Sequence, residues 1–180
     1  MLPQQIIEDI WSELQTACSD KQHAWRTPAL ATIDANGYPC ARTVVLRAVD
    51  AASQQMIIYT DRRSPKVLDL LRCKHAEIVF WNPALNWQLR AKAEIDVQTQ
   101  GNLLDQAWEN IKNSSAATDY LRNQLPGAVI NHANDTSQTS QEHQLCILAA
   151  KVTELDWLEL SRSGNRRLRI KNNQTEWLVP

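Results

Sequence analysis

A β-hairpin pattern stands out in residues 29–49, which run Ala-Leu-Ala-Thr-Ile-Asp-Ala-Asn-Gly-Tyr-Pro-Cys-Ala-Arg-Thr-Val-Val-Leu-Arg-Ala-Val. Residues 29–34 alternate apolar and polar side chains, as a half-buried strand does. Asn36-Gly37 follows, a strong signal for a two-residue hairpin turn. Residues 39–49 then have the composition of the return strand. The sequence therefore predicts an antiparallel strand pair near its N-terminal end.

Strand patterns continue along the chain and outnumber the helical ones. They cover residues 56–60, 77–81, 87–97, 145–160, 168–171 and 175–179. Apolar spacing predicts a helix within residues 1–20, a second that starts at Pro65 with Ser64 as its N-cap, and a helical insertion over 100–125. Residues 128–142 are polar and turn-prone, which predicts a flexible loop. We expect one mainly β domain over residues 1–180, an antiparallel barrel of six to seven strands with peripheral helices.

The composition is that of an ordinary globular protein and excludes some function classes. The net charge of −1 argues against a protein that bulk charge holds on nucleic acid or a membrane. The four cysteines form no CxxC pair, so we expect a reduced chain without disulfides and without a metal site. The first residues lack a signal-peptide pattern, and no apolar run approaches the length of a membrane span. These features predict a cytoplasmic location.

Residues 59–66, Tyr-Thr-Asp-Arg-Arg-Ser-Pro-Lys, combine a strand end, three basic side chains, two aliphatic hydroxyl groups and a helix N-terminus. A phosphate group is bound by this combination of positive charge, hydroxyl donors and the favourable end of a helix dipole. The alternative is a solvated basic turn with an N-cap. We favour the phosphate interpretation because several independent features coincide.

Arg42 lies inside an apolar strand pattern, where an unpaired charge is costly to bury. Alternation places Arg42, Val44 and Leu46 on one face and Thr43, Val45 and Arg47 on the other. Taken alone, Arg42 is best explained as a strand-end arginine that pairs with a local carboxylate. An anionic ligand is the alternative.

These motifs occur in a characteristic order. Arg-x-Val-x-Leu-Arg at residues 42–47 is followed by Tyr-Thr at 59–60, Ser-x-Lys at 64–66 and Trp-Gln at 87–88. Trp157 precedes Arg167 by ten positions, and the chain closes on Glu-Trp-Leu-Val-Pro. From about residue 25 to 180, this series resembles the FMN-binding split barrel of the pyridoxamine 5'-phosphate oxidase family. The resemblance implies a split β-barrel, an FMN cofactor, a small-molecule substrate and a homodimer with FMN at the interface.

The resemblance also implies roles for individual residues. Arg42 and Lys66 would hold the FMN phosphate, with further contacts from Tyr59, Thr60 and Ser64. The strand 42–47 would line the flavin, and Arg47 or Arg167 would stabilise the anionic reduced ring. Gln88, Trp157 and Arg167 would reach the flavin from the partner subunit, and Gln124 would replace a glutamine that meets it. The full set of expected cofactor residues is Arg42, Thr43, Val44, Val45, Leu46, Arg47, Tyr59, Thr60, Ser64, Lys66, Gln88, Gln124, Trp157 and Arg167.

Other positions depart from the family pattern. Ser163-Gly164-Asn165 stands where the oxidases carry the Arg-x-His that handles their substrate, and Arg47 replaces a lysine. Residues 122–127 resemble a variant subfamily of short, oxidase-related FMN proteins. We therefore expect an FMN-dependent oxidoreductase with an unknown substrate. The alternatives are an authentic pyridoxamine/pyridoxine 5'-phosphate oxidase or a non-catalytic flavin-binding protein. A barrel that stacks single-stranded nucleic acid on its tryptophans is disfavoured by the near-neutral charge.

Overall fold

The computed structural model describes residues 2–130 and 139–180, which form nine strands, three α-helices and two short 3₁₀ helices. The strands are β1 (Ala29–Ile33), β2 (Pro39–Thr43), β3 (Leu46–Asp50), β4 (Gln55–Asp61), β5 (His75–Asn82), β6 (Trp87–Gln98), β7 (Leu145–Glu159), β8 (Arg166–Lys171) and β9 (Gln174–Leu178). The helices are α1 (Pro3–Ser19), η1 (Ala24–Arg26), α2 (Pro65–Arg72), α3 (Asn102–Ile111) and η2 (Ser115–Tyr120). The loop predicted over 128–142 falls largely on 131–138, outside the described residues.

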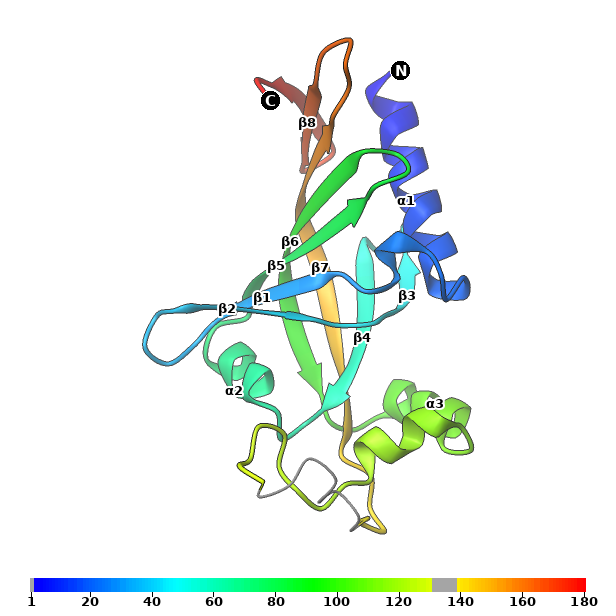
Figure 1. Ribbon diagram of the computed structural model, residues 1–180, viewed down its shortest axis with the longest axis vertical. Coiled ribbons are helices and arrows are strands. Elements are labelled where there is room, and N and C mark those ends of the chain that lie inside the picture. The colour runs from blue at the N-terminus through cyan, green and yellow to red at the C-terminus, as the bar shows by residue number, and fades with distance from the viewer. Residues whose placement is uncertain (1, 131–138) are drawn as a thin grey trace.

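All nine strands belong to one antiparallel sheet, so the predicted fold class is confirmed. Its main path runs β2-β1-β5-β6-β7-β4-β3, and β8 and β9 extend from β7. The two ends of this path, β2 and β3, are separated along the chain by Val44 and Val45 alone. The sheet must therefore curl until the end of β2 comes close to the start of β3, and Figure 1 shows the short connection between them. The chain closes the barrel at this seam, because no ladder of the described strands joins β2 to β3.

Two local predictions about the strands were wrong. Residues 39–49 are two strands rather than one, because the chain turns a corner at Val44-Val45 and moves from one edge of the sheet to the other. Splitting residues 39–49 at this corner turns the eight strand segments expected from the sequence into the nine described strands, more than the six to seven expected for the barrel. The turn before β2 is also longer than two residues. The Asp34 carboxylate accepts hydrogen bonds from the amides of Asn36 and Tyr38, and of the Asn36-Gly37 pair only Gly37 has a positive φ, at 85°.

Strand β7 is the longest element of the sheet and serves two ladders. Its first half pairs with β4, its second half pairs with β8, and β6 runs along its other edge. The β8–β9 hairpin therefore projects from one end of the barrel, while α2 and α3 lie towards the other end (Figure 1). The fold has two distinct ends.

Side chains from the two faces of β4 enter two different hydrophobic clusters. Met56 and Ile58 join the barrel interior, which also contains Trp25 and Trp157. Ile57 packs on the outer side, under α3 and η2. Both faces of β4 are thus covered, so the polar residues at its C-terminal end, Thr60 and Asp61, are each only 8% exposed. This buried strand end begins the candidate site.

The predicted helices are confirmed in place. The N-terminal helix is α1, and the insertion over 100–125 contains α3 and η2. Helix α2 begins at Pro65 with Ser64 in the N-cap position, as expected from the sequence. The Ser64 side chain makes no capping hydrogen bond to the helix, so its hydroxyl group is available for other contacts.

Candidate functional site

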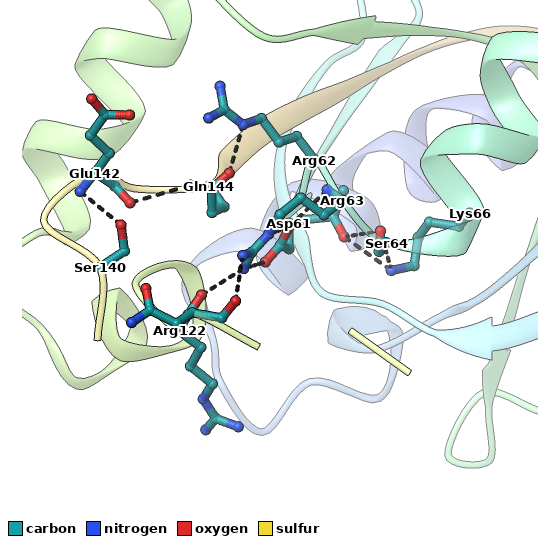
Figure 2. A network of polar contacts seen from close by, with 11 residues as sticks. Asp61, Arg62, Arg63, Ser64, Lys66, Arg122, Ser140, Glu142 and Gln144 are labelled. Carbon is teal, nitrogen blue, oxygen red and sulfur yellow. Dashed lines mark hydrogen bonds and ion pairs between the residues drawn. The ribbon is translucent and has the colours of Figure 1, made fainter. Parts of the chain in front are cut away.

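Lys66 lies among hydroxyl groups at the start of α2. Its Nζ donates to Thr60 Oγ1 at 3.0 Å and to Ser64 Oγ at 3.1 Å (Figure 2). Ser64 is only 2% exposed, and the two hydroxyl oxygens are 3.4 Å apart. The end of β4, the following turn and the first turn of α2 thus bring an ammonium group and two hydroxyl groups to one place. Amine and hydroxyl donors grouped in this way can bind an oxyanion.

Arg42 approaches from the opposite edge of the sheet. Strand pairing sets it beside Leu30 of β1, and its Nη1 donates to Thr32 Oγ1 at 2.7 Å. Its Nη2 lies 3.7 Å from Oδ2 of Asp69, which also accepts a hydrogen bond from the Thr32 hydroxyl. The expected local carboxylate is therefore Asp69 of α2. Asp69 holds Arg42 in position, and 25% of the Arg42 side chain remains exposed.

Burial lowers the pKa of Lys66, and the positive charge of Arg42 lowers it further. No described carboxylate forms an ion pair with the Lys66 ammonium group. The nearest candidates are engaged elsewhere, since Asp69 faces Arg42 and Asp61 is bound by Arg63. The site therefore carries uncompensated positive charge in a partly desolvated place, and such a place favours a bound anion.

A second group of expected residues lies on the ladder of β6, β7 and β8. Leu158 of β7 pairs with Gln88 on one side and with Arg167 on the other, which sets these two side chains in one row. Arg167 donates through Nε and Nη2 to the two carboxylate oxygens of Asp156, at 2.9 and 2.8 Å. Hydrogen bonds from Arg167 and Arg90 outweigh the opposing effect of burial, so the pKa of Asp156 is lowered. This row lies at the β8 end of the fold, away from α2 (Figure 1).

Trp157 lies in the barrel interior rather than on a surface. Its side chain is completely buried, and its ring meets Trp87 edge-on with centroids 5.2 Å apart. The Trp157 ring therefore has no exposed face in this chain on which a flavin could pack in the way that the resemblance implies. Leu46 is buried in the same interior cluster, with 0% exposure, so its side chain is also a core element.

The remaining residues of the 42–47 motif lie apart from one another. Val44 is buried, Val45 is half-buried, and Thr43 is exposed. Arg47 points to the outer side, where its guanidinium carbon lies 5.5 Å from the centre of the Tyr59 ring. Burial raises the pKa of Tyr59, and the charge of Arg47 opposes that rise. The expected motif thus places Arg42 near Lys66 and Arg47 beside the Tyr59 ring.

Two further expected segments line cavities. Gln124 lies in the wall of a cavity of about 300 Å³ together with Asp61 and Arg122. Ser163-Gly164-Asn165 forms the turn between β7 and β8, beside an open cavity of about 680 Å³ that the β5–β6 turn also lines. The only guanidinium group in that second wall belongs to Arg166, which is paired with Glu159 at 2.6 Å.

Comparison with known proteins agrees with this architecture. The family model for the pyridoxamine 5'-phosphate oxidase FMN-binding domain matches residues 8–99. The pyridoxine/pyridoxamine 5'-phosphate oxidase 2 of Arabidopsis thaliana is 30% identical over 151 residues, which cover 77% of this chain and 75% of that protein. This chain belongs to the pyridoxamine 5'-phosphate oxidase FMN-binding domain family. The family match contains Arg42, Thr60, Ser64 and Lys66, and it ends before Trp157 and Arg167.

Other known proteins match over shorter stretches or by fold. The pyridoxine/pyridoxamine 5'-phosphate oxidase of Chromohalobacter salexigens is 34% identical over 67 residues, 37% of this chain and 30% of that protein. An oxidase-related FMN-binding protein of Nostoc punctiforme superposes with a TM-score of 0.76 and 21% identity, over 100% of this chain and 99% of that one. PhzG of Burkholderia lata gives the same TM-score with 16% identity, over 99% and 92%. These two structures establish the shared fold.

Sequence reasoning missed two residues of the anion site, Thr32 and Asp69. Both are buried, with exposures of 1% and 6%. Asp69 carried a usable signal, because it is a single carboxylate between Val67-Leu68 and Leu70-Leu71. Thr32 is a polar residue on the inward face of β1, which alternation alone does not distinguish from a core threonine. No described helix is long and apolar enough to cross a membrane, and no described cluster of acidic, His or Cys residues could hold a metal ion.

Proposed function

We propose that this chain binds FMN and acts as an FMN-dependent oxidoreductase on a small molecule. The carrying observation is the Lys66 ammonium group, which is held by two buried hydroxyl groups beside Arg42 and has no carboxylate partner among the described residues. The terminal phosphate of FMN is a dianion with oxygens that accept hydrogen bonds. Lys66, Ser64 and Thr60 would hold it from one side and Arg42 from the other.

The residues present fit this group in both charge and hydrogen bonding. A phosphate would supply the counter-charge that Lys66 lacks, and charge-assisted hydrogen bonds of this kind are the strong ones. The N-terminus of α2 adds a favourable dipole at the same point. When bound, FMN supplies the hydride and electron chemistry, while the protein binds and orients the reactants.

We infer that a homodimer completes the site. Gln88 and Arg167 form a row at the β8 end of the fold, whereas Arg42 and Lys66 lie at the α2 end. This separation fits an arrangement in which each flavin meets the phosphate group of one subunit and the Gln88–Arg167 row of its partner. A size measurement in solution tests it, with one FMN bound per chain in a particle of twice the chain mass as the expected result.

The substrate class is constrained by the turn between β7 and β8. Ser163, Gly164 and Asn165 offer hydroxyl and amide groups, and the neighbouring Arg166 is neutralised by Glu159. These three positions carry no cation themselves, so a phosphate group on the substrate would have to meet Arg162, which is exposed in the same turn. The second candidate, an authentic pyridoxamine/pyridoxine 5'-phosphate oxidase, is supported by the name of the Arabidopsis relative. A cytoplasmic location remains a prediction.

Titration with FMN and with riboflavin tests the cofactor proposal, because the two ligands differ only in the phosphate group. We expect FMN to bind much more tightly than riboflavin, and the purified protein to show flavin absorbance. Equal affinity for both ligands, or no binding of FMN, would refute the proposal. Peroxide release with pyridoxamine 5'-phosphate would favour the authentic oxidase. Bound FMN that neither a B6 vitamer nor a nicotinamide reduces would favour a non-catalytic flavin-binding protein.

A further inference from the structure

The turn that carries Ser64 and Lys66 also contacts the connection between η2 and β7, of which residues 121–130 and 139–144 are described. Arg62 and Arg63 are neighbours in this turn and bind the two ends of this connection (Figure 2). Arg62 donates its backbone amide to the Gln144 carbonyl at 2.7 Å and its Nε to Gln144 Oε1 at 2.8 Å. Arg63 donates to the main-chain carbonyls of Arg122 and Asn123 at 2.7 and 3.2 Å.

Arg63 is also bound on its other side, to the strand that carries Thr60. Its Nε and Nη2 donate to the two carboxylate oxygens of Asp61 at 3.0 and 2.7 Å. The Asp61 carboxylate also accepts a hydrogen bond from the Arg63 backbone amide. The Asp61 backbone carbonyl accepts one from the Ser64 backbone amide. The planar guanidinium group thus joins the end of β4 to the 121–124 segment with a fixed geometry. A lysine cannot make this set of bonds, because it lacks the forked donors.

Arg63 joins two parts of the chain, and both contain or adjoin residues expected to bind the cofactor. On one side are Thr60, Ser64 and Lys66, the proposed phosphate ligands. On the other side is the segment that leads into Gln124, which shares its cavity wall with Asp61 and Arg122. Because Arg63 binds both parts, displacement of the 121–124 segment would disturb the hydrogen bonds of Asp61. In the same way, a turn with less freedom to move would hold the segment in place.

We propose that Arg63 is a positioning residue for the FMN phosphate site, and that phosphate binding and docking of the 121–124 segment stabilise each other. The proposal rests on the proposed FMN site. Arg63 touches no ligand in this arrangement and acts through Asp61 on Ser64 and Lys66.

The experiment compares Arg63→Gln and Arg63→Lys with the wild-type chain. A matched control is Arg26→Gln, because Arg26 also donates to two main-chain carbonyls, those of Ala17 and Cys18, but does so at the end of α1. Two quantities are measured. The first is the ratio of the FMN and riboflavin affinities. The second is the rate of tryptic cleavage after Arg122, the residue whose carbonyl Arg63 holds, with and without FMN.

We expect Arg63→Gln to weaken FMN binding about tenfold, the scale of one or two hydrogen bonds to a charged group, and to weaken riboflavin binding far less. Cleavage after Arg122 becomes several-fold faster in this variant. In the wild-type chain, saturating FMN slows that cleavage, and it slows it less in the variant. Arg63→Lys keeps the positive charge, yet it weakens FMN binding and speeds cleavage after Arg122 nearly as much as Arg63→Gln does. The Arg26→Gln control keeps the wild-type affinity ratio and cleavage rate, whatever its melting temperature.

Several results would overturn the proposal. An unchanged ratio in both Arg63 variants, or an equal loss of FMN and riboflavin affinity, would reduce Arg63 to a general structural residue. Wild-type cleavage after Arg122 that saturating FMN does not slow would remove the coupling, and that measurement needs no variant to fold. If wild-type protein binds FMN and only the variant effects are absent, the proposed function stands alone. If wild-type protein binds no FMN, both proposals fail.

Discussion

The guanidinium charge of Arg42 lowers the pKa of the Lys66 ammonium group, although β3 and β4 lie between the two residues along the chain. The curl of the sheet explains this closeness. Arg42 lies on β2 at one end of the strand order, and Lys66 follows β4 near the other end. Two like charges held near each other in a half-buried place favour a bound anion, and Asp69 faces only Arg42. The proposed phosphate site is therefore a consequence of how the barrel closes.

Removal of either cation is expected to weaken FMN binding. Arg42→Ala and Lys66→Ala each remove a charge-assisted contact worth about 1.5–3 kcal/mol, so each should lower FMN affinity about tenfold or more. Riboflavin affinity should change much less. Fluorescence titration measures both ligands, and Lys21→Ala, an exposed lysine after α1, is the matched control. A pair of variants that bind FMN as tightly as the wild-type chain would remove both residues from the phosphate site.

FMN affinity should pass through a maximum as pH is varied. Below about pH 6 the phosphate dianion takes up one proton and becomes a monoanion, so binding weakens. At alkaline pH, binding weakens again as Lys66 loses its proton. Because the pKa of Lys66 in the free protein is lowered from 10.5, this loss should begin at a lower pH than an ordinary lysine would show. Titrations across pH check the profile, and Lys66→Arg should shift the alkaline limb upward. An alkaline limb that stays in place in Lys66→Arg would assign it to another group.

The same lysine should reduce the stability of the protein without its ligand. The folded state binds the Lys66 proton more weakly than the unfolded state does, so the charged lysine destabilises the fold below its lowered pKa. That cost fades as pH rises towards 10.5, the ordinary value. Lys66→Met should therefore raise the melting temperature of FMN-free protein at neutral pH, with a smaller gain at alkaline pH. A variant that melts below the wild-type protein at neutral pH would contradict this account.

Cys146 should be inert towards thiol reagents in the folded protein. The residue is completely buried, and burial raises the pKa of its thiol to about 12, so almost no thiolate exists at pH 8. Cys40 and Cys73, which are both half-buried, provide the internal comparison. Mass spectrometry of protein labelled with iodoacetamide at pH 8 should find label on Cys40 or Cys73 first. Early labelling of Cys146 would show that the start of β7 opens readily.

Asp156 should stabilise the fold above acidic pH. Its carboxylate accepts hydrogen bonds from Arg90 and Arg167, and its lowered pKa means that this stability is present at neutral pH and is lost as pH falls below the ordinary value of 3.8. Asp156→Asn should lower the free energy of unfolding at pH 7 by about 1–3 kcal/mol. The difference from the wild-type chain should shrink below pH 4. Chemical denaturation at both pH values measures it, and a constant difference would point to a cause other than charge.

Local sequence patterns predicted the helices and strands of this fold better than the connections between them. Strand alternation and the helix-start signal at Ser64-Pro65 were sufficient for β1, β6 and α2. The corner at Val44-Val45 was not visible, because β-branched residues suit a strand and a barrel seam equally well. The seam depends on contacts between strands that are distant in sequence, and a single-sequence pattern does not contain them.

The candidate site divides in the same way. Lys66, Ser64 and Thr60 lie within one short segment, so their common role could be predicted from sequence. Asp69 could not be paired with Arg42, because that contact exists only when α2 packs beside β1, the strand that pairs with β2. Trp157 was assigned to a ligand surface on resemblance alone, and the structure places its ring in the core. Burial on β7 depends on the strands at both of its edges, which its own sequence does not reveal.

A crystal structure of the protein with FMN tests the central claim most directly. The account predicts phosphate oxygens within hydrogen-bonding distance of Lys66 Nζ and the Ser64 hydroxyl group, with the Arg42 guanidinium group facing the same phosphate. A phosphate bound elsewhere, with Lys66 still bonded only to Thr60 and Ser64, would contradict it.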